Sequence, residues 1–486
     1  MQVNQYFISN KPFQTPKNGK LTTIGEFSIW AHENLGVTEY TSGSVHLILL
    51  GFFVQPDSPQ KKNEDILTDL SSFTILSKEF FHFLNQLVGR FVLVVRTENN
   101  FIILNDSRAQ RQIFYFYNDN DLYITSSPKL FYDLTDFEFY IPKDKQVILA
   151  SKRYRVLDEW FPGDEYLDNH LKRLIPNFYL DIYSRETGRI PFSVLKMPKE
   201  NLKDYMKKQI IGAAEACAYR YENILFGVTG GSDSRLILSL NQSLKNASYF
   251  IYDREEKNSI DVKISKELTD KKGINLKIVE PKELSNSFLS FYKNQFLHPR
   301  IISKTQNFEW LSKNCQPAKS IVITGYSGEI YRNKILSVNP YHKKFQTTED
   351  FIDYFHYPKS QYLERMLKDW LDSARNYIKD CNHLTLPELF YWEIHVAYSA
   401  QYVFEQDVSG VEMFCPLSNR QMILNLIHNT TAEERSAPNG IIYQIINETS
   451  PQWKDIPYNP KPFHKKLKDT IFGFLPLNIV NRLINR

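Results

Sequence analysis

The stretch "GVTGGSDSR" at residues 227–235 brings two adjacent glycines, hydroxyl groups and one acid to the end of an apolar run. Gly230 and Gly231 lack the Cβ atoms that would keep an oxyanion away from backbone N–H groups, and glycines permit a turn with positive φ. We expect a helix after this loop, whose N-terminus adds the positive end of the helix dipole. The pattern therefore favours a phosphate as the bound group.

Asp233 is the one acid in this loop. An unshielded carboxylate would repel a phosphate, so its position implies that Mg²⁺ lies between them. We therefore expect Val228, Thr229 and Ser234 to bind a nucleotide together with the two glycines, and Asp233 to bind the metal. The alternative is a glycine-rich turn in which Asp233 and Ser234 only cap the helix.

A second corner of the same kind follows the apolar run "SIVIT" at residues 320–324. Gly325 and Gly328 form the turn, and Glu329 comes directly after it. In a parallel α/β sheet, ligands lie outside the carboxyl ends of the strands, so the two turns can meet at one edge. We expect Mg²⁺ between Asp233 and Glu329 there, with Gly325 beside the nucleotide. The alternative for Glu329 is a solvated acid at the start of a helix.

Short strands dominate the chain up to about residue 190. Five segments are rich in β-branched and aromatic residues and are separated by polar turns: "SVHLILLGFFV", "RFVLVVRT", "NFIILND", "QIFYFYN" and "DLYITSS". From the second segment on, they follow one another at intervals of about ten residues, and we expect no long helix between them. This spacing predicts antiparallel packing.

From about residue 200 the pattern changes to helices that alternate with brief apolar runs. The runs are "NILFGV", "SYFIY", "NLKIVE" and "SIVITG", which are typical of parallel strands covered on both faces. Beyond residue 345 almost every segment has helical periodicity. We therefore predict a two-domain α/β protein, with an antiparallel β-rich domain at 1–195 and a parallel α/β domain with a helical extension at 196–486, joined near "KMPKENLK".

Composition excludes several classes of protein. The 486 residues include 59 Lys and Arg against 55 Asp and Glu, and this small excess is spread along the chain, so we predict no nucleic-acid partner. The four cysteines lie too far apart for a zinc site or a disulfide framework. No apolar stretch is long enough to span a membrane, and the N-terminus lacks the apolar core of a signal peptide. We therefore expect a cytoplasmic protein, whose aromatic and basic C-terminus docks on the protein itself rather than on a membrane surface.

Both corners resemble known signatures. "TGGSDSR" is similar to the SGGxDS loop of the N-type ATP pyrophosphatases, with Thr229 in place of the first serine. "VITGYSGEIYR" resembles the SGExADE signature of the asparagine synthetase branch and retains only one of its usual acids. The segments from "GRFVLVV" to "DLYITSS" resemble the glutaminase-type (Ntn) domain of those enzymes, and "SPQWKDIPYNPKPF" resembles their closing segment. The resemblance spans nearly the whole chain and implies ATP and Mg²⁺ as cofactors.

One departure from the family concerns the N-terminal domain. Glutaminases of this superfamily use a cysteine after the initiator Met as the nucleophile, whereas this chain has Gln2. The Asn-Gly-Glu stretch that holds the glutamine amide is also missing, because "LLGFFVQP" stands in its place. We therefore expect a glutaminase-inactive member in which this domain is a scaffold.

The resemblance also implies catalytic residues. β-Lactam synthetases and lasso-peptide cyclases lack a working glutaminase and use an amine of the substrate, and the β-lactam-forming enzymes pair a tyrosine with a downstream glutamate as the base. Tyr326 stands in the tyrosine position, and Glu393 is its best partner. Lys461 in "YNPKPF" matches the catalytic lysine, which stabilises developing charge. The plain alternatives are a packing aromatic, an acid on a helix surface and a surface lysine.

These observations predict an ATP-dependent ligase that activates a carboxylate as an acyl-adenylate, releases pyrophosphate and forms an amide bond without hydrolysing glutamine. The expected partners are a small-molecule, glycan or peptide carboxylate and an amine donor; the sequence leaves their identity and the oligomeric state open. Two alternatives remain. One is an ammonia-dependent amidotransferase acting on a sugar acid in surface-polysaccharide biosynthesis, and the other is a catalytically silent scaffold.

Overall fold

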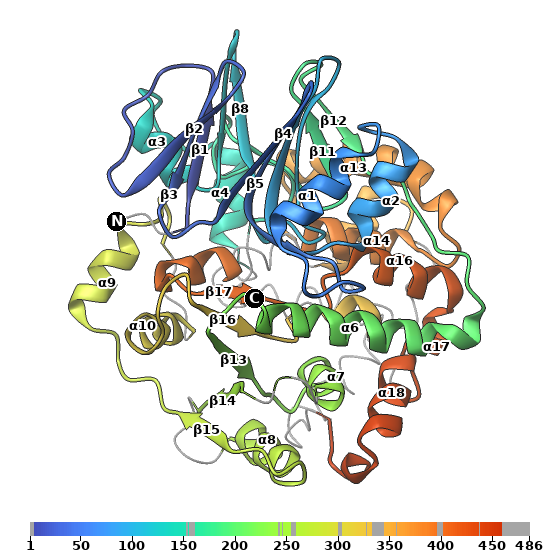
Figure 1. The fold of residues 1–486 in the computed structure, drawn as a ribbon. Coiled ribbons are helices and arrows are strands. Elements are labelled where there is room, and N and C mark those ends of the chain that lie inside the picture. The colour runs from blue at the N-terminus through green and yellow to red at the C-terminus, as the bar shows by residue number, and fades with distance from the viewer. Residues whose placement is uncertain are drawn as a thin grey trace.

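Two antiparallel sheets and one parallel sheet form the framework of the chain (Figure 1). The computed structural model describes residues 4–151, 154, 161–241, 244, 246–253, 259–299, 304–326, 328–332, 345–355, 357–395, 402–436 and 438–458. The described strands of the antiparallel sheets lie before residue 190, and those of the parallel sheet lie after residue 222. An antiparallel half therefore precedes a parallel α/β half, as the sequence predicts, whereas the boundary at 195 stays a prediction.

The antiparallel sheets have six strands each. The first sheet has the order β10 (Lys172–Arg173), β8 (Phe114–Asn118), β9 (Asp121–Thr125), β1 (Tyr6–Ser9), β3 (Phe27–His32) and β2 (Gly19–Ile24). The second has the order β12 (Glu186–Arg189), β11 (Phe178–Asp181), β7 (Phe101–Asn105), β6 (Val88–Arg96), β5 (Val45–Val54) and β4 (Val37–Ser42). The five strand segments predicted from the sequence correspond to β5, β6, β7, β8 and β9.

The two antiparallel sheets share a core because their central strands are apolar on both faces. In β5, Ile48 and Leu50 pack in one cluster with Ile8 of the other sheet. Leu47 and Leu49 alternate with them and belong to a separate cluster on the opposite face. The continuous apolar run of β5 therefore reflects a strand that is buried from both sides.

Helices cover the outer faces of these sheets. α1 (Asn63–Ser71) and α2 (Lys78–Gln86) pack on the second sheet, and α3 (Pro128–Leu134) packs on the first. α4 (Lys143–Ala150) follows in the chain. The sequence analysis does not predict α1 and α2, because helices of nine residues give only two to three turns of the apolar period.

The parallel sheet has five strands in the order β15 (Leu276–Val279), β14 (Ser248–Tyr252), β13 (Asn223–Gly227), β16 (Ser320–Ile323) and β17 (Glu412–Phe414). Each neighbouring pair is parallel. The four predicted apolar runs correspond to β13, β14, β15 and β16. β17 lies in the region that the sequence analysis expects to be helical, and its three residues are too few to show the alternation of a strand.

Helices lie on both faces of the parallel sheet. Phe226 packs with α6 (Leu202–Ala218) and α7 (Ser232–Leu240) on one face, whereas Leu225 packs with α10 (Thr305–Asn314) on the other. The other described α-helices are α8 (Ile260–Asp270), α9 (Asn286–Lys293), α12 (Thr348–Tyr354), α13 (Gln361–Tyr377), α14 (Leu386–Phe390), α16 (Arg420–Asn429), α17 (Ala432–Arg435) and α18 (Ile441–Thr449). Among the helices that the structure describes, none combines the length and apolar character needed to cross a membrane.

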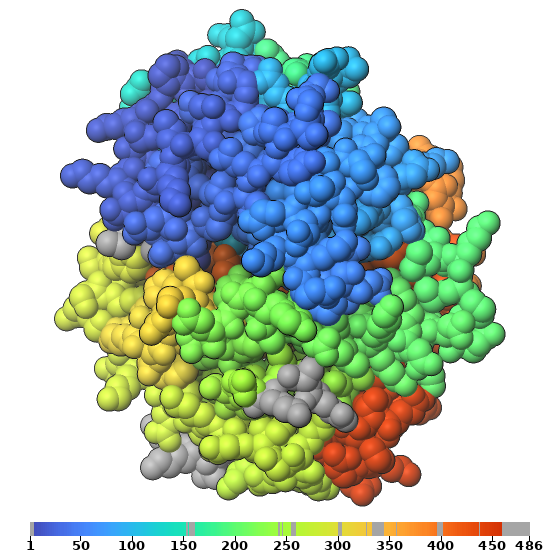
Figure 2. Space-filling view, in the orientation of Figure 1, coloured from blue at the N-terminus to red at the C-terminus, as the bar shows by residue number. Residues whose placement is uncertain are grey.

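The two halves of the chain pack directly against each other (Figure 2). Both terminal nitrogens of Arg90 donate to Asp407 at 2.6 Å. Ser107 Oγ donates to the Ser418 carbonyl at 2.7 Å, and Trp392 Nε1 donates to the Ser107 carbonyl at 2.8 Å. These polar side chains are buried, so the interface belongs to the interior of the molecule.

The four cysteines differ little in their surroundings. All four are free thiols, and Cys217, Cys381 and Cys415 are buried. Burial raises the pKa of the Cys415 thiol to about 11, so this thiol stays protonated and unreactive at neutral pH.

Candidate active site

The first glycine corner joins β13 to α7. Val228 N donates to the Phe250 carbonyl of β14 at 2.9 Å, which extends the sheet one residue beyond β13. Thr229 Oγ1 lies 2.7 Å from Ser234 Oγ, and Thr229 N donates to the same hydroxyl at 3.2 Å. The two hydroxyl groups therefore fasten the loop to the first turn of α7.

Close packing, rather than a positive φ, accounts for Gly230. Gly231 has a φ of −73°, and neither glycine has a positive φ. A Cβ atom on Gly230 would lie 2.9 Å from Asp261 Oδ1 and 3.1 Å from Ile264 Cγ2. The expectation of a left-handed turn is therefore wrong, and the close approach of α8 is the reason for a glycine at position 230.

An acid from α8 reaches the loop. Asp261 Oδ1 accepts a hydrogen bond from Gly230 N at 2.5 Å. A backbone N–H that meets a carboxylate oxygen in this position is also suited to a phosphate oxygen. The sequence analysis does not include Asp261. Its place in the first turn of the helix after β14 is the signal that could have found it, because ligands lie at this end of the sheet.

The second glycine corner interlocks with the first. β16 pairs with β13 in parallel, so the two corners start side by side. A Cβ atom on Gly325 would lie 2.4 Å from Ser234 N, and one on Gly328 would lie 2.3 Å from Asp233 Cγ. Any other residue at these two positions would therefore displace the start of α7.

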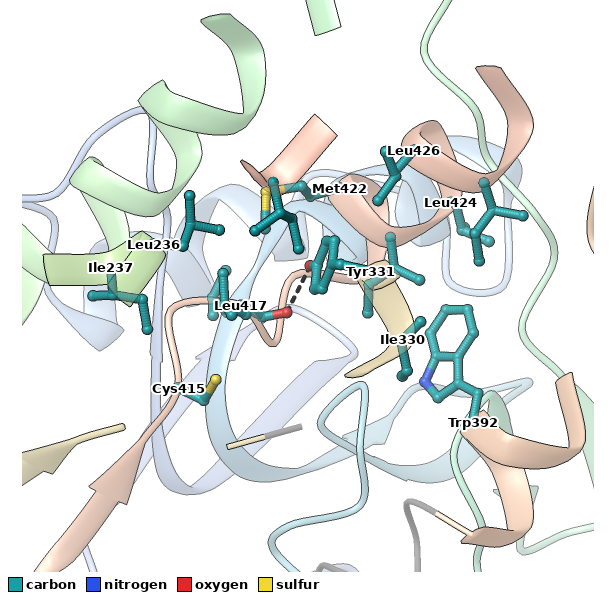
Figure 3. Packing of buried hydrophobic residues seen from close by; sticks show 14 of the residues in the cluster. Leu236, Ile237, Ile330, Tyr331, Trp392, Cys415, Leu417, Met422, Leu424 and Leu426 are labelled. Carbon is teal, nitrogen blue, oxygen red and sulfur yellow. Dashed lines mark hydrogen bonds between the residues drawn. The ribbon is translucent and has the colours of Figure 1, made fainter. Parts of the chain in front are cut away.

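Buried neighbours fix the turn at 328–332 that follows the second corner. Ile330, Tyr331 and Trp392 belong to one apolar cluster (Figure 3). Tyr331 OH donates to the Leu417 carbonyl at 2.6 Å, as the dashed line in Figure 3 marks. This packing holds the backbone that carries Glu329.

The structure brings Asp233 and Glu329 together and adds Arg332 to them. A terminal nitrogen of Arg332 lies 2.7 Å from Asp233 Oδ2. Burial raises the pKa of Asp233 to about 6, Glu329 adds to this rise, and Arg332 opposes it. The sequence analysis does not single out Arg332, which stands where the SGExADE pattern has its second acid. The replacement of an acid by a basic residue in this pattern is the sequence feature that could have identified Arg332.

The donor set suits Mg²⁺ that is bound together with phosphate groups. Mg²⁺ takes oxygen ligands and is commonly held by one or two carboxylates plus substrate phosphates. Asp233 and Glu329 provide two carboxylates beside the loop. Within the described ranges, no group of three or more His, Cys, Asp or Glu side chains is placed to hold a metal. Protein carboxylates alone would therefore give only part of the coordination shell.

Glu393 lies in a different environment from the one expected. Its carboxylate is fully buried and accepts hydrogen bonds from Arg189 at 2.6 Å and from Asn177 Nδ2 at 3.1 Å. Trp370 Nε1 donates to its other oxygen at 2.8 Å. The structure therefore does not bring Glu393 to Tyr326 as a catalytic pair. Glu393 instead ties the β11–β12 hairpin to α13.

Tyr326 packs against Tyr402, and Lys304 lies over the Tyr402 ring. Its ring centroid lies 5.5 Å from that of Tyr402, and Lys304 Nζ lies 4.9 Å from the Tyr402 ring. Tyr391 belongs to the same short helical turn as Glu393, but Glu329 of the second corner influences its pKa. Burial raises its pKa well above the usual range, and the nearby Glu329 adds to the rise. Tyr391 therefore lies near the second corner, a position that the sequence does not indicate.

Lys461 lies outside the described residues, but the segment before it is placed. The fully buried Arg235 donates to the carbonyls of Ile456 at 2.9 Å and Pro457 at 2.8 Å. It also donates to the Gly230 carbonyl at 3.1 Å, and its guanidinium lies 3.9 Å from the Tyr458 ring centroid. Arg235 therefore anchors the chain three residues before Lys461 to the first corner. Arg235 is the last residue of the motif "GVTGGSDSR", and the sequence alone did not predict this role.

Comparisons with known proteins add little to this geometry. No family model matches the chain, and no curated protein matches it. Among solved structures, the NH₃-dependent NAD synthetase from Campylobacter jejuni is 14% identical, with 43% of this chain and 95% of that chain covered and a TM-score of 0.21. NMN synthetase from Francisella tularensis is 12% identical, with coverage of 55% and 100% and a TM-score of 0.21. Glutamine phosphoribosylpyrophosphate amidotransferase from B. subtilis is 10% identical, with coverage of 67% and 70% and a TM-score of 0.20. Likenesses at this level do not establish a shared fold.

Proposed function

We propose that this protein is an ATP-dependent carbon–nitrogen ligase. It activates a carboxylate as an acyl-adenylate, releases pyrophosphate and joins the acyl group to an amine without hydrolysing glutamine. The observation that carries the proposal is the interlocking of two glycine corners at neighbouring strand ends, which brings one acid from each corner together. The resemblance of both corners to ATP-pyrophosphatase signatures supports the same reading.

The nucleotide half of the site lies at the first corner. Backbone N–H groups of Gly230 and of the first turn of α7 bind the phosphates, and the helix dipole favours their charge. Asp233 and Glu329 would hold Mg²⁺, which neutralises phosphate charge when it is bound. The residues that shape the loop around the nucleotide are Val228, Thr229, Gly231, Ser234 and Gly325.

The acyl-transfer half of the site lies beyond the second corner. Tyr326 and Tyr402 give it an aromatic wall, and Lys304 beside them can pair with a carboxylate. Lys461 keeps its proposed role, in which its ammonium stabilises the charge that develops on phosphoryl and acyl oxygens. An ammonia-using amidotransferase would employ the same residues, and the addition of ammonium to the assay separates the two reactions.

The N-terminal half acts as a scaffold in this proposal. Position 2 has Gln2 and therefore offers no thiol nucleophile. Buried contacts instead join this half to the rest of the chain, as the Arg90–Asp407 and Arg189–Glu393 pairs do. Incubation of the full chain with glutamine should yield no glutamate above background, and enzyme-dependent glutamate release would contradict this part.

Titration of the full chain with Mg-ATP in a calorimeter tests nucleotide binding. The wild-type chain should bind Mg-ATP, and Asp233→Asn should lower the affinity at least about tenfold because one of the two carboxylates loses its charge. Asp372→Asn is the matched control, since Asp372 is an exposed acid on α13 whose partner is Arg375. Equal affinities of the wild type and a folded Asp233→Asn variant would refute the proposed site.

A further inference from the structure

We infer that Arg332 is a built-in counter-ion of Asp233, which competes with a divalent cation for this carboxylate until phosphate groups draw the guanidinium away. The inference deepens the proposed function and rests on it. Its starting point is the ion pair at 2.7 Å between Arg332 and Asp233 at the centre of the interlocked corners. This pair places a cation at the carboxylate that the proposed function assigns to the metal.

Arg332 uses few of its N–H donors in hydrogen bonds with the described residues. One terminal nitrogen donates to Asp233 Oδ2, whereas Nε is buried without a hydrogen-bond partner among the described residues. A guanidinium offers five N–H donors in a planar fork, which matches phosphate oxygens in pairs. An arginine with unused N–H donors beside a phosphate-binding loop can release a carboxylate and bind a phosphate without leaving the site.

The charges around Asp233 favour this exchange. Glu329 and Arg332 are the charged groups that act most strongly on Asp233. Arg332 brings a single positive charge to Asp233, whereas a divalent cation would bring two and would attract both carboxylates. The arrival of phosphates adds negative charge on the side of the loop, which attracts Arg332 and frees Asp233 for the metal.

Binding of Mn²⁺ to the nucleotide-free full chain at pH 8, followed by electron paramagnetic resonance, tests the competition directly. Arg332→Met should tighten Mn²⁺ binding roughly tenfold or more, because a competing charge leaves the carboxylates. Arg332→Lys keeps the charge but not the fork, so its effect should be smaller, roughly twofold to fivefold. Arg365→Met is the matched control, because Arg365 is an exposed arginine of α13 that pairs with Glu165 at 3.2 Å, and its loss should leave Mn²⁺ affinity unchanged.

An unchanged Mn²⁺ affinity in folded Arg332→Met, with circular dichroism as the check of folding, overturns the inference. If that variant does not fold, Arg332→Lys decides, since a Mn²⁺ affinity equal to that of the wild type overturns the inference as well. The two proposals fail separately. Tighter Mn²⁺ binding without any binding of Mg-ATP would refute the proposed function alone. Mg-ATP binding combined with unchanged Mn²⁺ affinity would refute the role of Arg332 alone.

Discussion

Two clusters of arginine and acid can be compared in this chain, one between its halves and one at the glycine corners. At the interface, Arg90 and Arg111 face Asp407 and Glu412, so two guanidinium groups meet two carboxylates. At the corners, Arg332 is paired with Asp233, and Glu329 acts on the same acid. The first set pairs two arginines with two acids, whereas the second joins one arginine to Asp233 through a single terminal nitrogen.

The two clusters also differ in how many N–H donors of their arginines have hydrogen-bond partners. Arg90 uses Nε and both terminal nitrogens, and its side chain is 1% exposed. Arg332 donates to a single carboxylate among the described residues, and its side chain is 19% exposed. A buried and balanced network fits a structural role, because any change of partner would leave an unpaired buried charge. An arginine that uses only some of its N–H donors can accept a further anionic ligand, which fits a binding site.

Removal of the central interface arginine should have the largest effect on stability. Arg90→Met leaves Asp407 and Glu412 buried with one guanidinium between them, which should cost about 3–5 kcal/mol of unfolding free energy. Urea denaturation followed by circular dichroism measures this loss. A loss below about 1 kcal/mol would mean that the balanced network does not hold the halves together.

The acid at the corner should give the next largest effect, visible as a dependence on pH. The pKa of Asp233 is raised to about 6 in the folded chain, so the folded state keeps a proton there that the unfolded state loses at lower pH. Stability of the metal-free chain should therefore fall as pH rises from about 4 to about 6, by roughly 2–3 kcal/mol from this group. Asn at position 233 cannot titrate, so the unfolding free energy of Asp233→Asn should lack this fall. Relative to the wild type, the variant should therefore gain roughly 2–3 kcal/mol between about pH 4 and about pH 6. Parallel pH profiles of the two chains would contradict the assignment.

Glu393 should stabilise the contact between the two halves of the chain, because it pairs with Arg189. Glu393→Gln keeps the volume but removes the charge that faces Arg189, so it should lower the free energy of unfolding by about 1–3 kcal/mol. A double-mutant cycle with Arg189→Met should show a coupling energy, because the two side chains are 2.6 Å apart. Additive effects of the two substitutions would show that the pair contributes no stability.

An exposed pair provides the smallest expected effect. Glu448 pairs with Lys203 and Lys207 at the surface, where its side chain is 42% exposed. Glu448→Gln should change the unfolding free energy by less than about 0.5 kcal/mol, because solvent screens exposed charges. The same denaturation assay measures it, and an effect as large as that of Arg90→Met would show that burial does not set the ranking.

Sequence patterns could predict the strands that carry the two corners and the meeting of these corners. Apolar runs mark β13 and β16, and the turns after parallel neighbours lie at one edge, so the closeness of Asp233 and Glu329 follows from the order of elements. Single charged residues such as Asp261 and Arg332 have no period to mark them. The place of Glu393 depends on Arg189, which lies 204 residues away in the chain. Contacts of that range are set by tertiary packing and leave no local signal.

The most direct test of the account is the identity of the nucleotide products. The full chain would be incubated with Mg-ATP, ammonium and a panel of sugar acids, amino acids and peptides, and the products separated by ion-exchange chromatography. The account predicts AMP and pyrophosphate with at least one carboxylate, and a loss of roughly 10²–10³ in rate for Lys461→Ala. Formation of ADP and phosphate in their place would contradict adenylation. So would AMP and pyrophosphate formed at the same rate by Asp233→Asn.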